Sequence, residues 1–200
     1  MVQRLSIIIM RVKASFFWLF YNFIETYSMT AGLFAVFIDK ITNSIEEVAS
    51  GKSFDTHVQP VTEADLKAVT TRAGWLFNWK AEAREKDGRQ LFKLVTLQQP
   101  DRMQCLISCR KAAGYYFIPL IETAPHNFGR SKFYYGAPAN MVAFVCKLSF
   151  EAGFDGVVSF TPKSRLIRHY KTSLGAVLIN KIDMAIYTKD ARILVNSYYK

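Results

Sequence analysis

The sequence is poor in the residues that build metal centres and disulfide frameworks. Among 200 residues it has three cysteines, Cys105, Cys109 and Cys146, and three histidines, with no CxxC pair and no histidine cluster. Structural zinc sites and disulfide-stabilised secreted domains both need clustered or regularly spaced cysteines. The composition therefore predicts no metal site and a reduced, cytoplasmic protein.

The common catalytic and nucleotide-binding motifs are missing as well. The sequence contains no GxSxG, HExxH, Walker A or Rossmann glycine pattern. Each of those patterns fixes a nucleophile, a zinc ion or a phosphate-binding turn by residue spacing. A functional site therefore has to be sought in segments with weaker signatures.

Long runs of like charge are absent, although basic residues are in excess. The 26 Lys and Arg residues outnumber the 16 Asp and Glu residues, which gives a formal net charge of +10 without any block of five or six like charges. A phosphate-rich cofactor, RNA and an acidic membrane surface all suit this charge, and so does a merely solvated surface. Nucleic acid is thus a possible partner with weak support.

Residues 1–38 are strongly apolar but lack an uncharged stretch long enough for a clear membrane span. Arg11, Lys13 and Glu25 interrupt the apolar residues, and no small-residue cleavage pattern follows. One interpretation is an interfacial segment that contacts a membrane. The other is an extension upstream of the native start, with Met29 as the alternative start, and we favour it slightly because residues 39–200 suffice for a single domain.

Hydrophobic periodicity and turn residues predict a layered α+β domain. Three successive strands joined by short turns form an antiparallel meander, and a later strand that follows a helix can lie parallel to its neighbour. We therefore expect a mixed, mostly antiparallel central sheet flanked by helices on both faces. Strands are predicted at 54–58, 75–79, 90–97, 103–109, 115–122, 157–160, 177–179 and 184–187, and helices at 39–48, from Thr62, 141–152, 162–175 and 190–199.

A loop of small residues precedes the predicted helix at 141–152. Gly136, Ala137 and Ala139 would let a ligand approach the first amides of that helix, which lack intrahelical acceptors, and the helix dipole favours an anion there. Arg130 and Lys132 lie just upstream and add positive charge. The segment is typical of an anion site, and equally of a plain helix entry.

The order of these elements resembles the GNAT superfamily of N-acetyltransferases over residues 54–199. The resemblance is clearest in Ile121 to Pro125, in Gly136 with its following helix, and in 170–176. It implies acetyl-CoA held between two splayed strands, and direct acetyl transfer to an unidentified amine. Phe133 and Pro138 depart from the family's loop pattern, and so favour the alternative of a catalytically inactive interaction module with the same fold.

The resemblance also implies roles for individual residues. Glu122 would deprotonate the amine, and Tyr170 would donate a proton to the departing thiolate. A strand amide near Ile121 would polarise the thioester carbonyl. Glu122 equally suits a strand-end charge, and Tyr170 a core position. The residues implied in cofactor binding are Leu120, Ile121, Glu122, Thr123, Lys132, Tyr135, Gly136, Ala137, Ala139 and Asn140.

Overall fold

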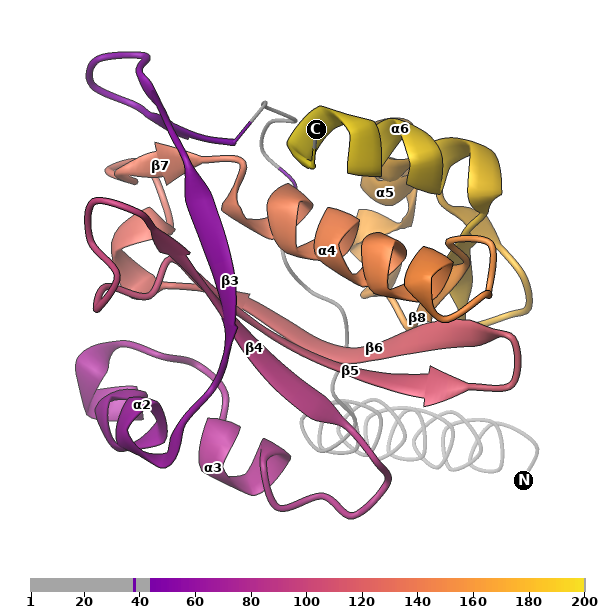
Figure 1. The fold of residues 1–200 in the computed structure, drawn as a ribbon, viewed down its shortest axis with the longest axis horizontal. Coiled ribbons are helices and arrows are strands. Elements are labelled where there is room, and N and C mark those ends of the chain that lie inside the picture. The colour runs from indigo at the N-terminus through magenta and orange to yellow at the C-terminus, as the bar shows by residue number, and fades with distance from the viewer. Residues whose placement is uncertain (1–37, 39–43, 200) are drawn as a thin grey trace, which may run out of the picture. The chain divides into compact units, whose positions relative to one another are not determined.

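The computed structural model describes Ile38 and residues 44–199 (Figure 1). The hypotheses for residues 1–37, including the alternative start at Met29 and the membrane contact, lie outside the described residues. Within the described part of the chain, no helix combines the length and apolar content needed to cross a membrane.

Over residues 44–199 the main sheet has seven strands, in the order β3-β4-β5-β6-β8-β10-β9 (Figure 1). Every neighbouring pair is antiparallel except β6 and β8, which are parallel because a helix connects them. A small second sheet has the order β2-β1-β7. The strands are β1 (Ile45–Glu47), β2 (Ser53–Phe54), β3 (Thr56–Pro60), β4 (Gln90–Thr96), β5 (Cys105–Ala112), β6 (Tyr115–Thr123), β7 (Tyr134–Tyr135), β8 (Val158–Phe160), β9 (Val177–Leu178) and β10 (Met184–Ile186).

Helices cover both faces of the sheet, as the sequence predicts. Helices α4 and α6 lie on one face, and α2 and α3 lie on the other (Figure 1). The predicted mixed α+β fold class is therefore confirmed. The helices are α2 (Glu63–Ala68), α3 (Trp79–Glu82), α4 (Ala137–Glu151), α5 (Ile167–Leu174) and α6 (Thr188–Tyr198), with 3-10 turns η1 (Thr71–Ala73), η2 (Pro125–Asn127) and η3 (Ser164–Leu166).

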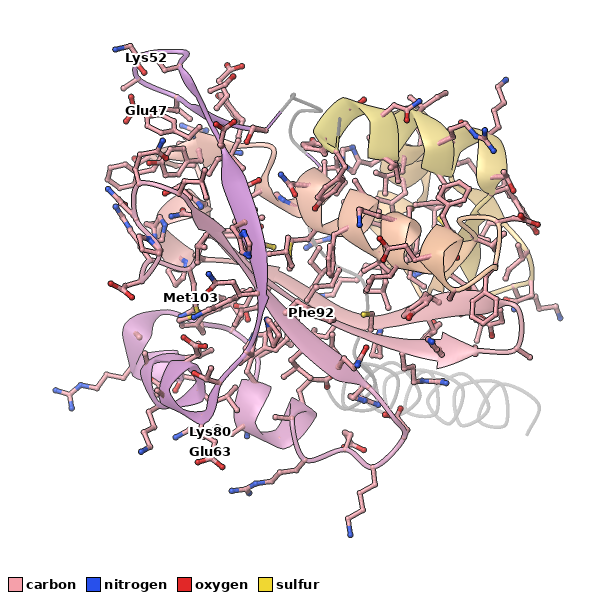
Figure 2. All side chains as sticks on the ribbon, viewed as in Figure 1. Glu47, Lys52, Glu63, Lys80, Phe92 and Met103 are labelled. Atoms are coloured by element: carbon pink, nitrogen blue, oxygen red, sulfur yellow. The ribbon has the colours of Figure 1, made fainter. Side chains whose placement is uncertain are left out.

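Strand alternation divides the interior into two clusters. Along β4, Phe92 (labelled in Figure 2) and Leu94 belong to the larger cluster under α4. The ring of Phe92 meets that of Phe144, with centroids 4.9 Å apart. Leu91 belongs to the smaller cluster, which packs against α2 and α3 and contains the fully buried Trp79. Burial of a large apolar side chain contributes about 1.5–3 kcal/mol, so both faces of the sheet stabilise the fold.

Helix α2 packs on the smaller cluster, and its N-terminus is fixed by hydrogen bonds. The hydroxyl of Thr62 accepts a hydrogen bond from the Asp65 amide, and the Asp65 carboxylate accepts one from the Thr62 amide at 2.8 Å. This reciprocal capping box matches the predicted helix start at Thr62. Lys93 from β4 donates to the same carboxylate at 2.7 Å, which ties α2 to the sheet.

Two element predictions are wrong, and a third differs from the structure only at its start. Within the predicted helix 39–48, Ile45–Glu47 form strand β1, which pairs with β2 and β7. The predicted strand 75–79 is a loop leading into α3, because Asn78 caps that helix; β4 pairs with β3 and β5 instead. The predicted helix 162–175 is present as the turn η3 followed by α5, and Gly175 ends it as predicted. Its start differs, because the Thr161 hydroxyl donates to Asp183 at 2.5 Å and caps no helix.

Candidate active site

A bulge in β6 separates that strand from β8. Between the paired residues Phe117↔Arg110 and Leu120↔Ser108, β6 advances by three residues while β5 advances by two. The extra residue falls next to Pro119, which has no amide hydrogen to donate to a ladder. Pairing with β8 ends at Ile118, so no described strand pairs with the β8-facing side of residues 120–123.

The bulge also redirects the side chains that follow it. Ile118 and Ile121 both belong to the larger cluster, whereas Leu120 belongs to the smaller cluster on the opposite face. Glu122 therefore points to the same face as α3 and its Trp79. A strand without the bulge would keep strict alternation, and would turn the carboxylate away from that face.

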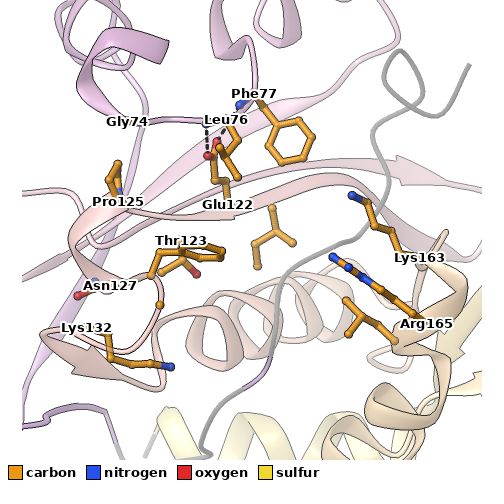
Figure 3. A pocket seen from close by; sticks show the side chains of 14 residues that line it. Gly74, Leu76, Phe77, Glu122, Thr123, Pro125, Asn127, Lys132, Lys163 and Arg165 are labelled. Atoms are coloured by element: carbon orange, nitrogen blue, oxygen red, sulfur yellow. Dashed lines mark hydrogen bonds between the residues drawn. The ribbon is translucent and has the colours of Figure 1, made fainter. Parts of the chain in front are cut away.

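A cavity of about 600 Å³ opens beside the unpaired part of β6 (Figure 3). In the described part of the chain, its wall comes from four segments: the end of β6, the loop between η1 and α3, the loop after β6, and the loop after β8. Apolar side chains line much of it, with a few charged groups among them, as in many small-molecule sites. The lining residues are Gly74, Leu76, Phe77, Ile121, Glu122, Thr123, Pro125, Asn127, Phe128, Gly129, Lys132, Lys163, Arg165 and Leu166.

Glu122 is a buried carboxylate held by three donors. The amide of Leu76 donates to Oε1 at 2.5 Å, and the indole of Trp79 donates to Oε2 at 2.6 Å. The amide of Phe77 adds a longer bond of 3.4 Å to Oε2 (Figure 3). Burial raises the pKa of Glu122 above its ordinary value, and the three hydrogen bonds oppose that shift only in part. A carboxylate has about four acceptor sites, so capacity for a further donor remains.

The loop that supplies two of these donors depends on Gly74. This residue ends η1 in the left-handed region at φ 92°, where side chains are strained. A Cβ placed on Gly74 would lie 3.0 Å from the Cβ of Pro125. Glycine therefore lets the η1–α3 loop approach the loop after β6, and the two loops form one wall of the cavity.

Positively charged side chains reach the cavity from two sides. Lys163 and Arg165 come from the loop after β8, and Figure 3 shows their charged ends directed toward the cavity, with Glu122 and Thr123 across from them. Lys132 comes from the loop after β6, where its ammonium lies 5.0 Å from the ring centre of Tyr135. The described lining thus brings three cations and one carboxylate to the same space.

The predicted cofactor residues fall into two groups in the structure. Ile121, Glu122, Thr123 and Lys132 line the cavity, whereas the remaining six do not. Those six are Leu120, which packs in the smaller cluster, and Tyr135, Gly136, Ala137, Ala139 and Asn140 at the start of α4.

Helix α4 begins at Ala137, four residues before the predicted start at 141, and its first turn is tightly packed. Gly136 adopts φ 86° as the residue before the helix, and Pro138 lies in the first turn, where a missing amide costs no helical bond. Ala137 and Ala139 are fully buried. The Asn140 side chain donates to Thr56 at 2.9 Å and accepts from a tyrosine hydroxyl.

Comparisons with known proteins find similarity only among solved structures. No protein-family model and no curated protein matches the chain. The ribosomal-protein-S18-alanine N-acetyltransferase from Escherichia coli is 13% identical, with a TM-score of 0.47 over 66% of this chain and 94% of that one. FeeM, an N-acyl amino acid synthase from uncultured soil microbes, is 12% identical, with a TM-score of 0.47 over 70% and 94%.

A third similar structure holds a bound cofactor. It is the spermidine N-acetyltransferase from Vibrio cholerae in complex with CoA and spermine, at 11% identity and a TM-score of 0.45 over 69% of this chain and 98% of that one. All three proteins are named for N-acyl transfer. At these identities the likeness carries no substrate over to this chain.

Tyr170 is not one of the residues that line the cavity. Its ring is fully buried and packs edge-on against Phe160, with centroids 5.5 Å apart. Burial raises the pKa of the Tyr170 phenol, while the charge of Arg165 lowers it slightly. The phenol is therefore protonated at neutral pH, and its role as an acid stays a prediction.

A polar network fixes the loop after β6. His126 donates through Nε2 to the side-chain oxygen of Gln104 at 2.9 Å, and the Asn127 side chain donates to the same oxygen at 2.9 Å. Burial, with a smaller effect of the Arg102 charge, lowers the pKa of His126 to about 4. His126 is thus neutral at physiological pH and positions the loop.

Sequence reasoning missed several residues of the cavity. Pro119 could have indicated the bulge, because a proline inside a strand pattern is typical of a bulge or an edge strand. Arg165 and the amides of Leu76 and Phe77 had no local signature. They reach the cavity only through pairing between strands far apart in the sequence.

Proposed function

We propose that this protein transfers an acyl group from acyl-CoA to an amine, with acetyl-CoA as the expected donor. The observation that carries this proposal is the unpaired stretch of β6 after the bulge, which borders a cavity containing a buried carboxylate. An extended ligand with amide groups can pair with such a strand edge. The pantetheine arm of coenzyme A has this chemistry.

Lys132 and the first turn of α4 are the proposed seat of the cofactor phosphates. Lys132 lines the cavity and precedes α4 by a few residues. Helix N-termini favour anions through their unpaired amides and the helix dipole. We retain the proposed cofactor-binding role for five residues around this turn, although they lie outside the cavity itself: Tyr135, Gly136, Ala137, Ala139 and Asn140.

Glu122 is the proposed general base. The amine nitrogen attacks the thioester carbonyl carbon, the C–S bond breaks, and the amine loses a proton while the thiolate gains one. A carboxylate with a raised pKa accepts that proton more readily than an ordinary one at neutral pH. The amide near Ile121 stabilises the developing oxyanion, and Tyr170 is the proposed acid.

Calorimetry with acetyl-CoA tests the cofactor site. Wild-type protein should bind, and Lys132→Glu should weaken binding about tenfold or more, because it places a carboxylate near the phosphates. Lys171→Glu is the matched control: Lys171 is an exposed residue of α5 that does not line the cavity. Absence of binding at millimolar acetyl-CoA would contradict the proposal.

Turnover measurements test the two proton-transfer roles. Glu122→Gln should lower kcat by about 10²-fold or more, which is the usual contribution of a general base, and should abolish the acid limb of the pH profile. Tyr170→Phe should lower kcat if the phenol is the acid. An unchanged rate would leave Tyr170 as a core residue beside Phe160.

A further inference from the structure

The charges of the cavity are unfavourable for a polycationic acceptor. Among the described residues that line the cavity, Lys132, Lys163 and Arg165 face one carboxylate, Glu122, which is already engaged by three donors. A polyamine would meet like charges with little anionic surface to balance them. An acceptor that carries a negative charge fits this cavity better.

We propose that the amine acceptor carries a carboxylate, as amino acids do, and that Lys163 and Arg165 bind that carboxylate. This inference rests on the proposed acyl transfer. The planar guanidinium of Arg165 can bind a carboxylate through two parallel hydrogen bonds, and Lys163 adds a second charge beside it. Neither side chain forms a hydrogen bond or ion pair with any described residue, so both are available to a ligand.

The position of this pair favours the acceptor over the donor. Lys163 and Arg165 line the cavity opposite Glu122 (Figure 3), the group proposed to deprotonate the amine. In an amino acid the amine and the carboxylate share one carbon atom, so both groups must be bound in the same small space. The donor phosphates already have Lys132 and the start of α4.

The remaining walls indicate an apolar amino-acid side chain. Leu76, Phe77 and Leu166 line the same cavity, and Leu76 is 70% exposed although it is a large apolar residue. Covering such a surface with an apolar ligand group is favourable. Phenylalanine and its derivatives are therefore suitable probes.

Direct binding tests the inference without catalysis. We would titrate N-acetylphenylalanine and N-acetylphenylalaninamide, which differ in one charge, into the wild-type protein by calorimetry. The acid should bind about ten- to a hundredfold more tightly, as expected for hydrogen bonds to a charged group. In the Lys163→Gln/Arg165→Gln variant this difference should disappear, whereas Lys171→Gln should retain it.

Kinetics with both substrates separates the acceptor from the donor. The double variant should raise KM for phenylalanine and leave KM for acetyl-CoA within about twofold, whereas Lys132→Gln should do the reverse. Equal binding of the acid and the amide, or a rise confined to the KM of acetyl-CoA, would overturn the inference. Selective binding of the acid without any turnover would instead contradict the proposed acyl transfer and leave the carboxylate site standing.

Discussion

The hydrogen bond from Trp79 to Glu122 links a core residue to the proposed base. It is short, at 2.6 Å, and it favours the ionised carboxylate, so it holds the pKa of Glu122 below the value that burial alone would give. Trp79→Phe should raise that pKa further and move the acid limb of the pH–rate profile to higher pH. The free energy of unfolding should fall by about 1–3 kcal/mol.

Trp75→Phe provides the control for this prediction. Trp75 is buried in the same cluster, but no hydrogen bond joins it to Glu122. Its replacement should cost stability through packing and leave the acid limb in place. Equal shifts of the limb in both variants would show that the hydrogen bond has no special effect on the base.

Asp65 makes stability depend on pH. Burial opposes ionisation of its carboxyl group, but hydrogen bonds from Lys93 and Thr62 outweigh burial and lower its pKa. A lowered pKa stabilises the fold above the unfolded value of about 3.9, and this contribution is lost as pH falls through the folded value. Asp65→Asn should therefore cost about 2 kcal/mol at pH 7 and much less near pH 2, by urea unfolding. An equal cost at both pH values would contradict this role of the Asp65 carboxylate.

At the scale of elements, the position of the η1–α3 loop depends on Gly74. Gly74→Ala adds strain at positive φ, about 1–2 kcal/mol, and a contact with Pro125. We expect lower stability and a slower reaction, because the amides that hold Glu122 follow directly. Gly114→Ala has the same kind of φ strain, 82°, but its Cβ meets no atom within 4 Å. Gly114→Ala should lower the stability and leave the reaction rate unchanged. Equal losses of rate in the two variants would contradict a role for the η1–α3 loop in the reaction.

Elements with strong local signals could be predicted from the sequence. Three such signals each locate their element to within a few residues along the chain: the capping residues of α2, the apolar run of β6 and the closing Gly175 of α5. The segment from Trp75 to Trp79 could not be predicted in this way, because its aromatic residues suit a strand and a buried loop equally. The cavity itself arises from a bulge and long-range pairing, so Glu122 was found while Arg165 was not.

Across the whole molecule, positive charge is concentrated near the C-terminus. The last forty residues contain eight Lys and Arg and two Asp. Charge of this kind raises the local concentration of anionic ligands, and salt screens it. Affinity for acetyl-CoA should therefore fall between about 0.1 M and about 1 M salt, where the screening length shrinks from about 10 Å to about 3 Å. Binding of the uncharged N-acetylphenylalaninamide should change little, and an equal loss for both ligands would exclude an electrostatic cause.

The short pairing between β6 and β8 has a mechanical consequence. Three residue pairs join the β3–β6 half of the sheet to the β8–β10–β9 half along the backbone. A ligand laid along the open edge would act as a missing length of strand and reinforce this seam. Its binding energy would then couple the unfolding of the two halves, so the ligand would serve as a structural part of the sheet as well as a reactant.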